Sequence, residues 1–118
     1  LINDANNMTR IKLNSKINIY RSYMHSDDLA NWLIKIVKNS NTKCPIYNVG
    51  SNKVINLKNL AKKIGLIANK KISVKTNKSK KFDYYVPSIT KAYKKLNLKI
   101  SINLNDALNS IIKSNDKN

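Results

Sequence analysis

The stretch Arg21-Ser22-Tyr23-Met24-His25-Ser26-Asp27-Asp28-Leu29-Ala30 decides the fold, together with the shorter stretch Ile46-Tyr47-Asn48-Val49-Gly50-Ser51. The first predicts a strand over 20–25 that runs into a helix, because apolar residues then recur with the spacing of one helical face, at positions 29, 32, 33, 36 and 37. Ser26 or Asp27 is expected to cap this helix, and the carboxylates of Asp27 and Asp28 favour its positive end. The second stretch predicts a strand over 46–49 that ends in a turn at Gly50.

Outward from these stretches, the hydrophobic period alternates between values typical of helices and of strands, which predicts one mixed α/β domain. Further short strands are expected around 11–13 and 72–75, and further helices over 57–67, 88–96 and 104–112. Asn56 is the expected cap of the helix over 57–67, and Asn103 is the expected cap of the helix over 104–112. Gly65 is expected to loosen or end the helix over 57–67. Residues 1–113 are assigned to the domain and 114–118 to a frayed polar tail. The apolar pattern at the start resembles the end of a helix already under way, so a truncated coding sequence is expected.

The charge balance suggests a different function and must be weighed. The 118 residues include 23 Lys and Arg against 6 Asp and Glu, a formal charge of +17. Such a balance gives strong phosphate affinity when the charges gather on one face. Here almost all of the basic residues are Lys, and they are scattered along the chain beside many Asn and Ile residues. AT-rich codons encode Lys, Asn and Ile, so we interpret the charge as a result of biased genome composition, carried by lysines on a solvated surface. Proteins that read bases rely more on Arg and aromatic platforms. A small basic module that binds nucleic acid is the alternative function.

Several classes of protein are disfavoured by what the sequence lacks. A single cysteine, Cys44, excludes an internal disulfide, and no His/Cys cluster predicts a zinc site, so a reducing, cytoplasmic compartment fits best. No apolar run reaches the roughly 18 residues that span a membrane, and no signal-peptide pattern opens the chain.

Four short patterns follow one another in a characteristic order. The strand–helix stretch 21–30 reads R-x-Y-x-x-x-x-D-L-A, and 47–51 reads Y-N-V-G-S. Residues 85–96 read Y-x-P-S-x-x-K-A-x-x-x-L, and 104–108 read L-x-D-A-L. In this order the patterns resemble the C-terminal third of NAD-dependent nucleotide-sugar epimerases and dehydratases of the extended short-chain dehydrogenase/reductase superfamily.

The resemblance implies an α/β substrate-binding part whose Rossmann core is missing. No glycine-rich phosphate loop and no Tyr-x-x-x-Lys couple in a family-like context occurs in the chain, so the catalytic residues are expected upstream of residue 1. NAD or NADP would be held by the full-length parent and not by this fragment alone. The fragment alone is therefore expected to be inactive.

The resemblance also assigns candidate site residues. Arg21 is expected to reach the diphosphate of the nucleotide sugar, a task that suits a permanently charged, planar fork. Lys78 and Lys81 lie where the family often carries a second diphosphate-binding arginine, although a solvated lysine run is the alternative there. Asp28, Asn48 and Gly50 are expected to be structural members of their motifs.

The implied function is that of the nucleotide-sugar-binding part of an epimerase or dehydratase in polysaccharide precursor biosynthesis. In that family NAD takes a hydride from the sugar ring and later returns it, and the diphosphate holds the sugar in place. The expected partners are a nucleotide-diphosphate sugar, the N-terminal Rossmann portion and a second subunit in a full-length homodimer. Neither a specific nucleic acid nor a membrane is an expected partner.

Overall fold

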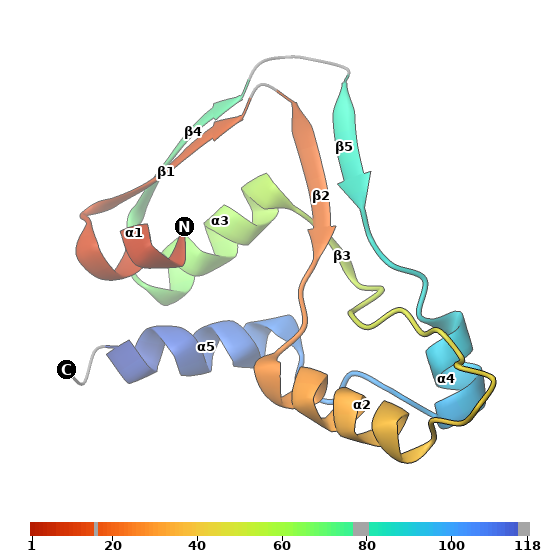
Figure 1. Ribbon diagram of the computed structural model, residues 1–118. Helices are drawn as coiled ribbons and strands as arrows, with labels where there is room; N and C mark the ends of the chain where they lie inside the picture. Colours follow the sequence, from red (N-terminus) through yellow and green to blue (C-terminus); the bar gives the residue numbers. More distant parts are fainter. Residues whose placement is uncertain (16, 77–80, 116–118) are drawn as a thin grey trace.

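The computed structural model describes residues 1–15, 17–76 and 81–115 and has an α/β fold (Figure 1). The helices of this part are α1 (Ile2–Asn7), α2 (Ser26–Lys38), α3 (Leu57–Ile67), α4 (Thr90–Leu96) and α5 (Leu104–Asn115). Its strands are β1 (Arg10–Ser15), β2 (Asn18–Ser22), β3 (Val54–Asn56), β4 (Lys71–Thr76) and β5 (Phe82–Tyr85). The predicted fold class, short strands alternating with helices, is thus confirmed, with α1 as a fifth helix.

The described strands form two small sheets. In the first, β1 runs parallel to β4, with Ile11 opposite Ile72. In the second, β2 lies in the middle, antiparallel to β3 and parallel to β5. β1 is followed closely in the sequence by β2, and β4 by β5. The two neighbouring strands of the first sheet are thus each succeeded by a strand of the second sheet (Figure 1).

Helices α1, α3 and α5 gather around the first sheet and form one apolar core with it (Figure 1). Its buried members are Ala5, Ile11, Leu60, Ile64, Leu108 and Ile112. Gly65 was expected to loosen or end the helix at 57–67, but α3 continues to Ile67 and Gly65 is buried. A Cβ at Gly65 would lie 2.5 Å from Ile72 Cγ1, so the glycine lets β4 approach the helix closely.

A second, separate core lies between α2 and α4. Trp32 of α2 is its largest buried side chain, and it packs with Ile89, Ala92 and Leu98. The indole Nε1 of Trp32 donates a hydrogen bond to the carbonyl oxygen of Lys99 at 3.1 Å. This bond satisfies the polar atom of an otherwise apolar side chain inside the core.

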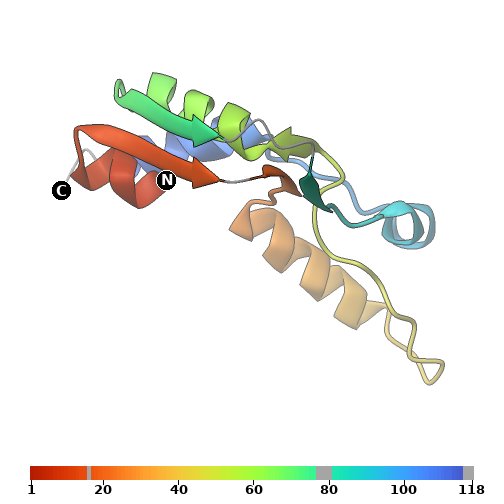
Figure 2. The same cartoon turned by 90° about the horizontal axis from the view of Figure 1, so that it is seen from above.

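The chain is flat and extended for its length. Its radius of gyration is 17.0 Å and its principal extents are 52 × 41 × 16 Å, whereas a compact domain of this length has a radius of about 13.5 Å. Figure 2 shows α2 projecting away from the layer that contains α1, α3, β1 and β4. Only part of the predicted apolar face of α2 is covered: Trp32 is buried, but Leu29, Leu33 and Val37 are exposed, Val37 at 69%. The unit therefore presents an apolar helix surface to its surroundings.

Several predicted boundaries need correction. Residues 46–49 form no strand, because no neighbouring strand offers a hydrogen-bonded ladder and Tyr47 and Val49 instead pack onto the second core. The strands β3 and β5 lie where the sequence analysis expected no strand. The cap of α2 is His25, whose side chain accepts a hydrogen bond from the backbone N–H of Asp27, and not Ser26 or Asp27. Helix α5 extends to Asn115, so residues 114 and 115 of the expected tail are helical, and 116–118 lie outside the described residues.

Candidate functional site

Arg21 lies on β2, the middle strand of the second sheet. In the strand register its neighbours are Ile55 of β3 and Tyr85 of β5. Side chains alternate between the two faces of a strand, so Arg21 shares its face with Asp83 and Tyr85. Tyr20 and Tyr84 lie on the opposite face, with ring centroids 6.1 Å apart. The arginine is thus fixed between two hydrogen-bonded strands, with its side chain 30% exposed.

Among the described residues, the guanidinium of Arg21 donates to three acceptor atoms, which belong to two residues. Its Nη2 donates to Oδ2 of Asp83 at 2.5 Å, which makes an ion pair between β2 and β5. Its Nη1 donates to the backbone carbonyl of Tyr20 at 2.8 Å and to that of Asp83 at 3.3 Å. These contacts fix the direction of the guanidinium, and they leave some of its five N–H donors for another acceptor.

The ion pair shifts the pKa of both partners in the direction that favours their charged forms. The hydrogen bond from Arg21 lowers the pKa of Asp83, and the same bond raises the pKa of Arg21 above its already high usual value. Burial raises the pKa of the Tyr23 phenol, an effect that the nearby charge of Arg21 reduces. Arg21 is therefore a permanent cation and Tyr23 a neutral phenol at physiological pH.

Two clefts meet at Tyr23. The larger, of about 530 Å³, lies between the β2–α2 connection and the helices α1, α3 and α5, and most of its lining is apolar. The smaller, of about 320 Å³, has a mixed lining, in which apolar side chains alternate with two lysines and two asparagines: Lys53, Lys63, Asn59 and Asn105. Lys63 is held there by a hydrogen bond from its Nζ to Oδ1 of Asn105 at 2.9 Å. The smaller cleft thus offers an anionic group more favourable surroundings than the larger one.

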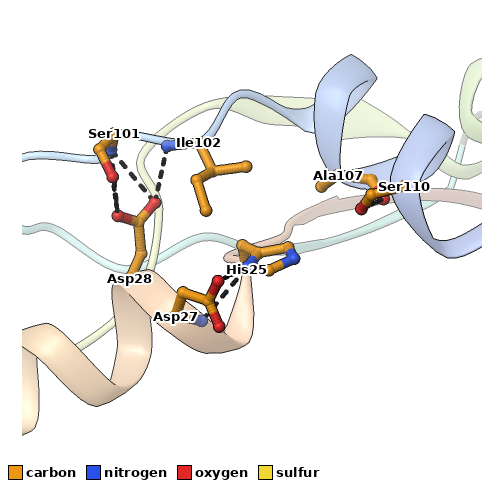
Figure 3. Close-up of polar contacts among 7 residues, drawn as sticks. All are labelled: His25, Asp27, Asp28, Ser101, Ile102, Ala107 and Ser110. Atoms are coloured by element: carbon orange, nitrogen blue, oxygen red, sulfur yellow. Dashed lines mark hydrogen bonds and ion pairs between the residues drawn. The ribbon is translucent and has the colours of Figure 1, made fainter.

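Asp28 lies in the first turn of α2 and is 2% exposed (Figure 3). Its carboxylate accepts hydrogen bonds from the backbone N–H groups of Ser101 and Ile102 at 3.0–3.2 Å and from the Ser101 hydroxyl. Burial alone would raise the pKa of Asp28, but these bonds outweigh it, so the pKa is lowered. Asp28 joins α2 to the segment that leads into α5.

Asn48 and Gly50 lie together beside the segment that precedes α4. Asn48 Nδ2 donates to the carbonyl of Ser88 at 3.1 Å. Gly50 has φ = 155°, and a Cβ there would lie 2.9 Å from Cγ of Pro87. Both residues thus connect the segment 46–50 to residues 87–88, and neither belongs to the sheet that carries Arg21.

Of the two predicted lysines, only Lys81 belongs to the described residues. Lys78 lies outside the described residues. Lys81 directly precedes β5, and its carbonyl accepts a hydrogen bond from the backbone N–H of Asn18 at 3.2 Å. The backbone of Lys81 thus lies beside the strand that carries Arg21.

Two kinds of site find no support in the described residues. No group of three or more His, Cys, Asp or Glu side chains there could hold a metal ion. In the same part of the chain, no helix is both long and apolar enough to cross a membrane.

Asp83, the partner of Arg21, was not among the site residues predicted from the sequence. The two residues are 62 positions apart, and only the parallel pairing of β2 with β5 brings them together. The available signal was weak: Asp83 is one of only 6 acidic residues, and it lies two positions after Lys81, the last residue of a lysine-rich stretch.

Comparisons with known proteins find a similar fold in solved structures of enzymes named for sugar-nucleotide substrates. Neither a scan against protein-family models nor a search of curated proteins gives a match. Among solved structures, dTDP-glucose 4,6-dehydratase from Bacillus anthracis in complex with NAD has a TM-score of 0.79 at 15% identity, over 99% of this chain and 38% of that one. UDP-N-acetylglucosamine 4-epimerase from Bacillus cereus has a TM-score of 0.78 at 20% identity, over 98% and 42%. UDP-glucose 4-epimerase from Thermotoga maritima, solved with UDP-glucose, has a TM-score of 0.76 at 17% identity, over 92% and 35%.

At these identities the likeness shows a shared fold. The chain spans about two-fifths of the length of the three structures, between 35% and 42%. The fold is thus that of part of a larger enzyme in each of them.

Proposed function

We propose that this chain is the nucleotide-sugar-binding part of an NAD(P)-dependent epimerase or dehydratase, in which Arg21 binds the diphosphate. The observation that carries the proposal is the placement of Arg21. An arginine is fixed by backbone carbonyls on the middle strand of a small sheet, within a fold shared with enzymes of nucleotide sugars. A guanidinium with a fixed direction loses little conformational freedom when it binds an anion, and its planar donors match phosphate oxygens.

The proposed contribution to the reaction is positioning. Binding energy from the diphosphate, a group that does not react, holds the sugar in one orientation against the reacting groups. Lys53 and Lys63, which line the smaller cleft at Tyr23, add to the positive potential there. Which nucleotide and sugar bind, and whether the outcome is epimerisation, dehydration or reduction, depends on groups beyond this site.

The dinucleotide cofactor does not fit the described residues. A dinucleotide fold needs glycines in the turn that precedes a helix, so that backbone N–H groups can approach the pyrophosphate. Gly65 lies inside α3 against Ile72, and Gly50 lies against Pro87, so neither opens such a turn. NAD or NADP therefore belongs, in this proposal, to a separate Rossmann portion.

The exposed face of α2 supports a partner of that kind. Leu29, Leu33 and Val37 present adjacent apolar side chains on one helix, and a surface of this kind is typical of an interface. A Rossmann portion that packs on it would cover this face. Assembly into a homodimer and a role in polysaccharide precursor biosynthesis stay predictions. The proposed compartment is the cytoplasm, which suits the free, exposed thiol of Cys44.

The test is nucleotide-sugar affinity in the protein as its gene encodes it. Arg21→Ala is expected to weaken binding on the order of 30- to 1,000-fold, because a charge-assisted bidentate contact is lost. Arg21→Lys should recover only part of the affinity, since lysine supplies the charge without the fork. Calorimetric titration with UDP-glucose, UDP-N-acetylglucosamine and dTDP-glucose measures the effect.

The matched control is Arg10→Ala, which removes the other arginine of the chain from the exposed start of β1. This variant should leave both nucleotide-sugar binding and cofactor retention intact. Equal affinity of the wild-type protein and Arg21→Ala for every ligand they bind would refute the role proposed for Arg21.

A further inference from the structure

We propose that Asp83 is an internal competitor for the anion: its carboxylate occupies the guanidinium of Arg21 and must leave when a diphosphate binds. This inference rests on the proposed function of Arg21. Every anion that binds must first displace the same carboxylate, so Asp83 sets the least binding free energy that an anion must supply to occupy Arg21.

The geometry separates two kinds of contact at Arg21. The carboxylate of Asp83 occupies Nη2, whereas the carbonyls of Tyr20 and Asp83 occupy Nη1. Both carbonyls belong to strands, and Asp83 is held in register opposite Ile19. When the carboxylate rotates away, the carbonyl contacts therefore remain and keep the guanidinium oriented.

Charge explains why the carboxylate must leave. A diphosphate that reaches Nη2 would place its negative oxygens next to the carboxylate of Asp83, and like charges at such a distance repel strongly. The Asp83 side chain is 47% exposed, on a strand at the edge of its sheet. Rotation into solvent thus exposes a carboxylate to water and leaves no polar group buried without a partner.

Displacement has a modest and fixed cost. Ion pairs between partly exposed side chains contribute little because water screens them. An anion with one charge makes a contact with Arg21 equivalent to the one that the carboxylate loses, so the net binding free energy is close to zero. A diphosphate supplies more charge and several acceptor oxygens, so it gains more than the displaced pair loses. With Asp83 in place, single carboxylates and other monovalent anions therefore bind very weakly, whereas a diphosphate still binds.

The experiment compares pyrophosphate and acetate as probes, in the protein as its gene encodes it. Asp83→Asn keeps the size of the side chain and removes its charge. This variant is expected to bind pyrophosphate about 2- to 5-fold tighter than the wild-type protein, the range that corresponds to a lost surface ion pair. Its affinity for acetate should rise by about the same factor, because both anions displace the same carboxylate at the same cost.

Asp106→Asn is the control for net charge, since it removes an exposed carboxylate from α5. Its affinity for pyrophosphate should stay within the error of the wild-type value. The NMR signal of the Arg21 side-chain N–H gives a second readout, because it should shift on Asp83→Asn substitution and again on pyrophosphate addition.

The outcomes separate this inference from the proposed function. Weaker or unchanged pyrophosphate binding by Asp83→Asn, together with a loss of binding in Arg21→Ala, overturns the role of Asp83 and keeps that of Arg21. Unchanged binding in Arg21→Ala, or no binding by any of the proteins, overturns both. Circular dichroism of each variant shows whether the fold is retained, and the Arg21 signal reports on the ion pair even where affinity is low.

Discussion

At the scale of single residues, Asp28 shows how this small chain tolerates a buried charge. Burial removes water from the carboxylate and by itself raises its pKa, but hydrogen bonds from Ser101 and Ile102 more than compensate. The donors come from a segment more than 70 positions away in the chain. One carboxylate thus joins α2 to the segment before α5, and its protonation should loosen that connection.

We expect the stability of the fold to depend on pH through Asp28. Its folded pKa lies below the unfolded value of about 3.9. The stabilisation is therefore fully present above that pH and is lost as the pH falls through the folded pKa. Asp28→Asn should cost about 1.5–3 kcal/mol of unfolding free energy at pH 7, as expected for a hydrogen-bonded charged group, and should flatten the decline of stability at acid pH.

Urea unfolding between pH 2.5 and 7 measures this effect. Asp27→Asn is the matched control, because Asp27 lies in the same first turn of α2 but is 71% exposed at its side chain. Asp27→Asn should retain the acid decline of the wild-type protein. If Asp28→Asn retained it as well, another carboxylate would be responsible.

Residues differ in how far they could be predicted from the sequence. Asn56 caps α3 as expected, with its side chain accepting a hydrogen bond from the backbone N–H of Lys58, because a cap depends on residues two or three positions away. The pairing of Arg21 with Asp83 depends on which strands become neighbours, and the residues next to Arg21 or Asp83 in the sequence do not indicate that β2 pairs with β5.

At the scale of elements, the amphipathic helices and the strands β1 and β4 were predictable, and the shortest strands were not. The bounds of α3 agree with the predicted 57–67, because its apolar period covers three turns. β3 has three residues and β5 has four, too few for alternation to be recognised, and each exists only because β2 lies between them. The segment 46–49 has the composition of a strand but lacks a neighbour to pair with.

Gly65 offers a test of packing between α3 and β4. An alanine there gains about 1 kcal/mol of helix propensity, but its Cβ would lie 2.5 Å from Ile72 Cγ1 and 3.1 Å from the carbonyl oxygen of Lys70. Overpacking of this kind costs about 1–3 kcal/mol. We therefore expect Gly65→Ala to lower the unfolding free energy, measured by urea denaturation.

Two further variants separate packing from propensity. Lys62→Ala, at an exposed position of the same helix, should be nearly neutral. Gly65→Ala combined with Ile72→Ala should cost less than the sum of the two single changes, because the clash is removed. Strict additivity would show that Gly65 matters for another reason.

At the scale of the whole molecule, the charge of +17 tests the alternative function. If the lysines form a solvated surface, binding to nucleic acid arises only from counterion release. We expect duplex and single-stranded DNA to bind weakly, without preference for sequence, and to dissociate at about 0.15–0.2 M salt. Fluorescence anisotropy with two unrelated oligonucleotides measures this. A complex that selects one sequence and survives 0.2 M salt would favour the nucleic-acid module instead.

The flat shape of the molecule leads to the last prediction. The chain has two small cores, and an apolar face of α2 is left exposed, so it buries less apolar surface than one closed core would. A Rossmann portion packed on that face would bury more. We expect the 118-residue chain alone to unfold with low cooperativity, to bind hydrophobic dyes and to turn over no nucleotide sugar with NAD or NADP present. A matching Rossmann half, added in trans or fused, should sharpen the unfolding transition and restore turnover.

Variants of α2 test whether its apolar face makes this contact. Leu29→Ser combined with Leu33→Ser should reduce dye binding by the isolated chain and prevent its assembly with the Rossmann half, because both leucines are exposed in the chain alone. Lys35→Ser, on the same helix, is the control and should assemble normally. Turnover of a nucleotide sugar by the purified 118-residue chain would contradict the division of labour proposed here, because the chain would then supply both the cofactor site and the catalytic groups.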